Sequence, residues 1–115
     1  MEHTTEQVDG VTVITLQGSI DVSQAIELRE LLGDRISGAA ARVLLDLTNV
    51  RLIDSSGIGI LVTAHRRAAD ASAGFALANP SEAVGKVLTM TRTDRLLNVY
   101  DSVAEGVAGL SGAAP

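Results

Sequence analysis

The sequence predicts an α/β fold: a single domain with a mixed β-sheet of about five strands and about four helices. Apolar, β-branched runs alternate with segments of helical periodicity in the order β-β-α-β-α-β-α-β-α. The pair Asp9-Gly10 separates the first two runs and is a hairpin turn signal, so these strands are expected to be antiparallel. A helix separates each later pair of strands, which predicts parallel crossover connections.

The N-terminal hairpin is expected to use residues 4–8 and 11–16. The second segment, VTVITL, alternates apolar and polar side chains and is rich in β-branched residues, as half-buried strands are. After it, Asp21 and Gln24 have the spacing of a capping box, so Asp21 is expected to cap the first helix. That helix is expected to end near Gly38 and to bury the apolar side chains of Ala25, Leu28, Leu32 and Ile36.

The second half of the chain continues the alternation of strand and helix. A nearly continuous apolar run at 42–47 predicts a strand buried on both faces, followed by a loop with the sequence TNVRLID. Residues 56–71 predict a helix with one side formed by Ile58, Leu61, Val62 and His65. Residues 74–79 predict another buried strand, and Pro80-Ser81 a helix start. The segments NVYDS and SVAEGVAGL predict the last strand and the last helix.

Composition is typical of one globular domain, because 46% of the 115 residues are hydrophobic and 20% are charged. We expect residues 1–115 to form one domain, with its core at about 4–110 and a disordered tail at 111–115. The net charge is −5 and no basic cluster exceeds the pair Arg66-Arg67. Nucleic acids and anionic membranes are therefore not expected as partners.

Several classes of site are not expected. The chain has no cysteine, which excludes disulfides and thiolate metal sites. Its histidines and carboxylates show no metal-ligand spacing and no phosphate-binding P-loop motif is present, so no metal or cofactor is expected. Without a visible signal peptide or an apolar run near the ~20 residues of a membrane span, the sequence predicts a cytoplasmic protein.

The most unusual segment is RLIDSSGIGILV, at residues 51–62. Asp54 and Ser55 are residue types that cap helices. A cap alone does not explain two glycines, each of which costs roughly 1 kcal/mol relative to alanine inside a helix. Gly57 and Gly59 leave the backbone bare, so that the protein's own sheet, an anion or another protein can approach it closely.

The two serines of this segment are not equivalent. If Asp54 or Ser55 caps the helix, that side chain is bound to the backbone. Ser56 then keeps a free and exposed hydroxyl in the first turn, and it is the better candidate for modification. A serine hydrolase is not favoured, because G-x-S-x-G is absent and His65 lies more than two turns along the same helix. His3, in the N-terminal segment, is not expected to supply the base either.

Two motifs together resemble one known family. Gly18-Ser19-Ile20-Asp21 follows the second strand, and DSSGIG, residues 54–59, opens the second helix. With the longer stretches VLLDLTNVRLIDSSGIGIL and ANPSEAVGKVL, the chain resembles the STAS domain family, and in particular the bacterial anti-sigma factor antagonists. It departs from the family pattern at Ser19, where an acidic residue is common, and at TMTRTD, where a small turn is expected.

The resemblance implies a regulatory switch. In the family, the unphosphorylated antagonist binds an anti-sigma factor, itself an ATP-dependent serine kinase, and so releases a sigma factor. The kinase phosphorylates the second serine of the motif, which is Ser56 here, and a PP2C-type phosphatase reverses the step. Asp21 matches a surface aspartate beside that serine. The partner-binding residues implied are Asp21, Asp54, Ser55, Ser56, Gly57, Ile58 and Gly59.

Other roles within the same family stay open. A STAS domain also serves as a subunit of a stress-signalling scaffold or of a lipid-transport ATPase. The freestanding chain and the intact DSSG motif favour the antagonist.

Overall fold

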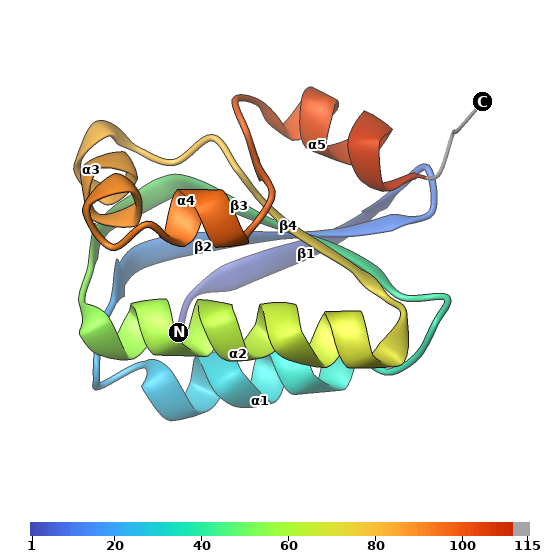
Figure 1. The fold of residues 1–115 in the computed structure, drawn as a ribbon, viewed down its shortest axis with the longest axis horizontal. Coiled ribbons are helices and arrows are strands. Elements are labelled where there is room, and N and C mark those ends of the chain that lie inside the picture. The colour runs from blue at the N-terminus through green and yellow to red at the C-terminus, as the bar shows by residue number, and fades with distance from the viewer. Residues whose placement is uncertain (112–115) are drawn as a thin grey trace.

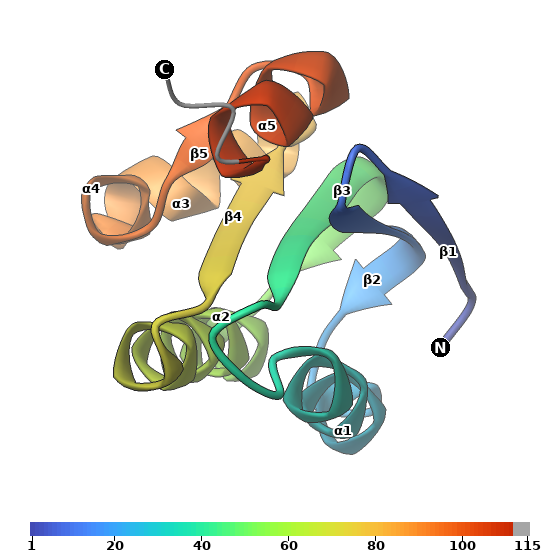
Figure 2. The same cartoon turned by 90° about the vertical axis from the view of Figure 1, so that its right-hand side faces the viewer.

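The computed structural model describes residues 1–111 and contains one five-stranded sheet of order β1-β2-β3-β4-β5 (Figures 1 and 2). β1 pairs antiparallel with β2, and every later pair is parallel. The strands are β1 (His3–Val8), β2 (Val11–Ile20), β3 (Arg42–Ile53), β4 (Gly74–Ala78) and β5 (Val99–Tyr100). The mixed sheet predicted from the sequence is confirmed.

Helices cover both faces of the sheet, with α1 and α2 side by side on one face and α5 on the other (Figure 2). The helices are α1 (Ala25–Arg35), α2 (Ser55–Ala71), α3 (Glu82–Met90), α4 (Thr93–Leu96) and α5 (Val103–Leu110). The single turn α4 is additional to the four predicted helices and begins in the segment TMTRTD, where the sequence departs from the family pattern.

Two apolar clusters hold these layers together. The larger one lies between the sheet and α1 and α2, and it also receives side chains from α3. The smaller one lies under α5, where Val107 and Leu110 pack on Leu44 of the central strand. Phe75 is the single aromatic residue of the larger cluster, so its packing depends mainly on Leu, Ile and Val. The prediction that residues 28, 32 and 36 face the core is confirmed.

The prediction that β2 ends at residue 16 and that a loop follows β3 at residue 47 is wrong. Both strands continue, β2 to Ile20 and β3 to Ile53, and these two residues pair with each other. The register shifts between Gly18 and Ser19, and Gly18 has φ +93, a left-handed conformation that glycine adopts without strain. The added parts of β2 and β3 contain exposed polar residues, so their sequence lacks the apolar pattern that indicates a strand.

The predicted cap of α1 is also wrong. α1 begins at Ala25 with Gln24 as its N-cap residue, and no side chain caps it. Asp21 instead accepts hydrogen bonds from the amide and hydroxyl of Ser23, at 2.9 and 2.6 Å. This Asx turn places one non-helical turn between β2 and α1, and the aspartate is used there rather than at the helix.

The buried face of α2 differs from the predicted one. Gly57, Ile60, Leu61, Ala64 and Ala68 are buried, whereas Ile58, Val62 and His65 are half-buried. The predicted start of α3 is confirmed, because Ser81 caps it by accepting from the Val84 amide. Of the tail predicted to be disordered, residues 112–115 lie outside the described residues. Ser111 is described, and its amide donates to the carbonyl of Val107.

Candidate functional site

The start of α2 is anchored to the end of β2 through Asp54. The Asp54 carboxylate accepts a hydrogen bond from the Gly57 amide at 3.0 Å, so Asp54 is the N-cap residue. Its own amide donates to the Ile20 carbonyl at 3.2 Å, and its carbonyl accepts from the Ile58 amide. One residue therefore caps the helix and joins it to the neighbouring strand, which fixes the first turn of α2 in place.

The two glycines of the motif face different surroundings. A Cβ atom on Gly57 would lie 2.6 Å from the Ile20 carbonyl oxygen and 2.7 Å from side-chain carbons of Ile20 and Ile53. Gly57 is buried, so the surface that approaches its bare backbone is the protein's own sheet. Gly59 is exposed, and a Cβ atom there would have no neighbour within 4 Å. Gly59 therefore leaves an open surface beside Ile58.

The two serines also differ. Ser55 is exposed, whereas Ser56 is half-buried, so Ser56 is less exposed than the sequence suggested. Within residues 1–111 the Ser56 hydroxyl makes no hydrogen bond. It borders a solvent-open hollow between the first turns of α2 and the start of α1, opposite Val22 and Ile26. The hydroxyl is thus unbonded and can be reached from one side.

Asp21 lies next to this corner but borders a different hollow, shared with Gln17, Asn49 and Arg51. The hydrogen bond from the Asp54 amide joins the start of α2 to the carbonyl of Ile20, the residue before Asp21. The hydrogen bonds from Ser23 lower the pKa of Asp21, because they stabilise the charged carboxylate. Asp21 is therefore a fixed negative charge at neutral pH.

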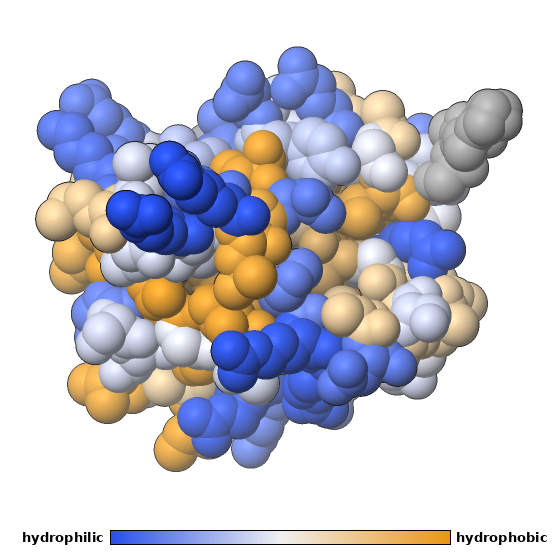
Figure 3. Space-filling view, in the orientation of Figure 1, coloured by the Kyte–Doolittle hydropathy of each residue, from blue (hydrophilic) through white to orange (hydrophobic). Residues whose placement is uncertain are grey.

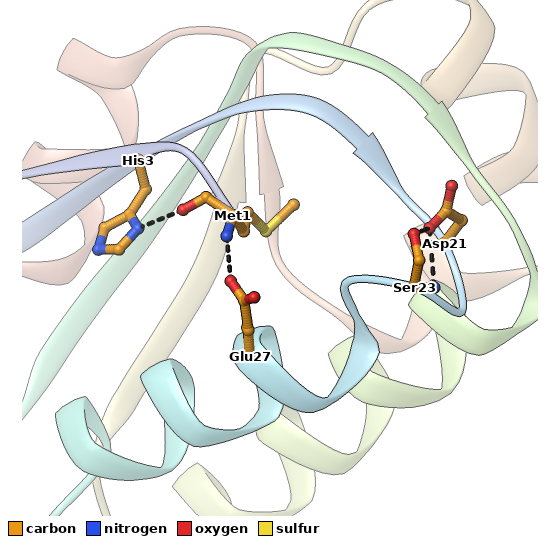
Figure 4. A network of polar contacts seen from close by, with 5 residues as sticks. All are labelled: Met1, His3, Asp21, Ser23 and Glu27. Carbon is orange, nitrogen blue, oxygen red and sulfur yellow. Dashed lines mark hydrogen bonds and ion pairs between the residues drawn. The ribbon is translucent and has the colours of Figure 1, made fainter.

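A second polar cluster lies at the N-terminus, separate from Asp21 and Ser23 (Figure 4). The Met1 ammonium group forms an ion pair with Glu27 of α1. This ion pair lowers the pKa of the Glu27 carboxyl. The contact ties the chain end to α1, and the ammonium charge offsets the negative charge of the Glu27 carboxylate.

Exposed apolar side chains flank the corner and were not singled out from the sequence. Val22, Ile26 and Leu52 are 71, 67 and 52% exposed. Apolar surface gathers over the N-terminal ends of α1 and α2, at the lower left of Figure 3. The sequence carried a signal for this apolar surface, because Val22 and Ile26 are about one helical turn apart and lie outside the predicted core face of α1.

No side chain of residues 1–111 makes a hydrogen bond with the Ser56 hydroxyl. His65 lies nine residues further along α2, which is about 13 Å at the helical rise per residue. It is half-buried and makes no hydrogen bond with the serine. Among residues 1–111, no group of three or more metal-ligating side chains is placed to hold an ion. No helix in that range is long and apolar enough to span a bilayer.

The fold and the corner define a small α/β domain with a serine pair on the first turn of a helix beside the sheet. The chain belongs to the STAS domain family, whose model matches residues 2–106. A Thermotoga neapolitana protein whose name describes it as a putative anti-sigma factor antagonist is 34% identical over 71 residues. These are 62% of this chain and 63% of that protein, so the match spans slightly less than two thirds of the relative.

Solved structures of similar proteins cover nearly the whole chain. The crystal structure of a protein given the same description, from Thermotoga maritima, has a TM-score of 0.86 at 25% identity and covers 94% of this chain and 93% of that chain. The anti-sigma factor antagonist SpoIIAA in its unphosphorylated form has a TM-score of 0.78 at 20% identity, covering 99% and 100%. Bacillus SpoIIAA in its phosphorylated form has a TM-score of 0.69 at 20% identity, covering 94% and 98%. The likeness to SpoIIAA concerns the fold.

Proposed function

We propose that the chain is an anti-sigma factor antagonist. In its unphosphorylated form it binds an anti-sigma factor that is also an ATP-dependent serine kinase, and this binding releases a sigma factor. The protein acts in the cytoplasm as a binding module without catalysis of its own. The single observation that supports this most directly is the unbonded hydroxyl of Ser56 on a helix start held rigidly by Asp54.

The proposed contact surface is the corner where β2, β3 and α2 meet. It uses the residues Asp21, Asp54, Ser55, Ser56, Gly57, Ile58 and Gly59. Gly57 acts indirectly within this set, because it is buried and its role is to let α2 lie close to Ile20. Gly59 is open and allows a flat partner surface to approach the turn.

Phosphorylation of Ser56 ends the interaction. The kinase transfers the γ-phosphoryl group of ATP to Oγ of Ser56: the new Oγ–P bond forms, the bond to the ADP oxygen breaks and the hydroxyl proton leaves. A PP2C-type phosphatase hydrolyses the ester and restores the hydroxyl. The phosphate adds a charge of about −1.5 to −2 at neutral pH.

The domain tolerates this charge better than its partner does. The amides of Ser55 and Ser56 lie in the first turn, where a helix offers unpaired donors and favours an anion by roughly 0.3–1 kcal/mol. In the complex, the same dianion would be buried in an interface shaped for a hydroxyl, at a cost of several kcal/mol. A loss of about 3–4 kcal/mol weakens affinity by two to three orders of magnitude.

The test uses the serine kinases encoded in the protein's own genome. Incubation with the cognate kinase and ATP is expected to add one phosphate by intact mass, and Ser56→Ala is expected to abolish the addition. Ser55→Ala is the matched control and should still be labelled. Labelling that persists in Ser56→Ala refutes the site, and an absence of labelling by every such kinase refutes the function. Recovery of an ATP-binding-cassette subunit from native cells would favour the transport role instead.

A further inference from the structure

One arginine borders the same hollow as Ser56 and has no partner of its own. Arg29 of α1 is exposed and makes no hydrogen bond or ion pair with any of residues 1–111. The positions three and four residues away on its helix are Ala25, Ile26, Leu32 and Gly33, so no acidic side chain lies at a distance that supports a helical ion pair. Its guanidinium is therefore an uncompensated charge.

The hollow itself connects Arg29 with Ser56. Its lining includes both residues, together with Gly59 and Thr63 on the α2 side. Gly59 has no Cβ, and no atom lies within 4 Å of the place where one would stand. At Gly59, therefore, no side chain projects into the hollow that Ser56 and Arg29 border. Arg29 is the one charged residue of this lining among the described residues.

We propose that Arg29 pairs with the phosphate once Ser56 is phosphorylated, an inference that rests on the proposed function. A guanidinium presents paired N–H donors that match two phosphate oxygens. The pair bridges the hollow from α1 to α2 and places the phosphate against Val22 and Ile26. Phosphorylation then weakens partner binding in two ways, since it adds charge to the corner and also places a bulky group in the hollow beside it.

The experiment installs phosphoserine at position 56 during translation, so that no kinase is needed. Phosphorus NMR then follows the second ionisation of the phosphate at low salt. Its pKa is expected to be about half a pH unit lower in the unsubstituted protein than in Arg29→Gln, the size typical of an exposed ion pair. Arg29→Lys should retain most of the shift, and added salt should reduce it. Arg35→Gln, on the same helix but away from the hollow, is the control and should match the unsubstituted protein.

An identical phosphate pKa in the unsubstituted protein and in Arg29→Gln overturns the pairing. An equal change in Arg35→Gln overturns it as well, because the effect would then be one of net charge. Neither result affects the labelling of Ser56 by a kinase, which tests the proposed function. Conversely, a kinase that ignores Ser56 leaves the NMR measurement valid.

Discussion

The two glycines of the DSSGIG motif give a sharp test of how the corner is built. Gly57→Ala puts a methyl group 2.6 Å from the Ile20 carbonyl oxygen, which belongs to the backbone and cannot rotate away. Relieving this overlap is expected to cost about 1–3 kcal/mol. The shift also strains the hydrogen bond from the Asp54 amide to that carbonyl, worth about 1 kcal/mol. The better helix propensity of alanine offsets about 1 kcal/mol of this loss.

The net expectation for Gly57→Ala is a free energy of unfolding lower by about 2 kcal/mol. For a domain of this size that lowers the melting temperature by about 8 °C. Gly59→Ala is the matched control, since its methyl group meets no atom within 4 Å. It should be neutral or stabilising by up to about 1 kcal/mol. Differential scanning calorimetry and urea denaturation measure both variants.

Two results would refute this reasoning. If Gly57→Ala melts at the same temperature as the unsubstituted protein, the close approach of α2 to Ile20 is not a constraint. If Gly59→Ala is the less stable variant, the assignment of the inward and outward glycines is reversed. Binding to the anti-sigma factor separates the two further, because Gly59→Ala should weaken binding while the fold stays intact.

Three further outcomes follow from the caps and the Asx turn. Ser81→Ala removes the cap of α3 and a hydrogen bond to the Val50 carbonyl, and calorimetry should show a loss of about 1–2 kcal/mol. Asp54→Ala should cost about 1 kcal/mol, whereas Asp54→Ser, which preserves the cap, should cost less; equal losses would contradict the capping role. Ser23→Ala should raise the pKa of Asp21 toward its ordinary value, measured by carboxyl NMR titration. Because the folded pKa of Asp21 is lowered, its stabilising contribution is complete above the ordinary carboxyl pKa and is lost as pH falls through the folded one. In Ser23→Ala the folded and unfolded pKa values move together, so this pH-dependent contribution should shrink; an unchanged titration would contradict the Asx turn.

The features that the sequence predicted well depend on neighbours a few residues apart. A cap uses one side chain and an amide three residues later, so the sequence could narrow the cap of α2 to Asp54 or Ser55 and place a helix start at Pro80-Ser81; the structure has Asp54 and Ser81 as the caps. The apolar face of α1 and the Asp9-Gly10 hairpin follow from periodicity and turn chemistry in the same way. The candidate site was therefore located by its local pattern.

The lengths of β2 and β3 could not be predicted from local pattern. The residues that extend β3 include exposed polar side chains, and they form a strand because residues more than thirty positions earlier pair with them. The cap of α1 was mispredicted for a local reason, because the Asp21 carboxylate accepts hydrogen bonds from Ser23, two residues later, instead of capping the helix.

The sequence alone determined that a capped helix follows a buried strand, and that the first turns of this helix carry two glycines and two serines. It could do so because caps and glycines act over one helical turn. Only the tertiary structure decided that Gly57 faces the sheet while Gly59 faces solvent, since that depends on where Ile20 lies. It also decided that Arg29 and Ser56 border one hollow, because that hollow exists only where α1 and α2 pack side by side.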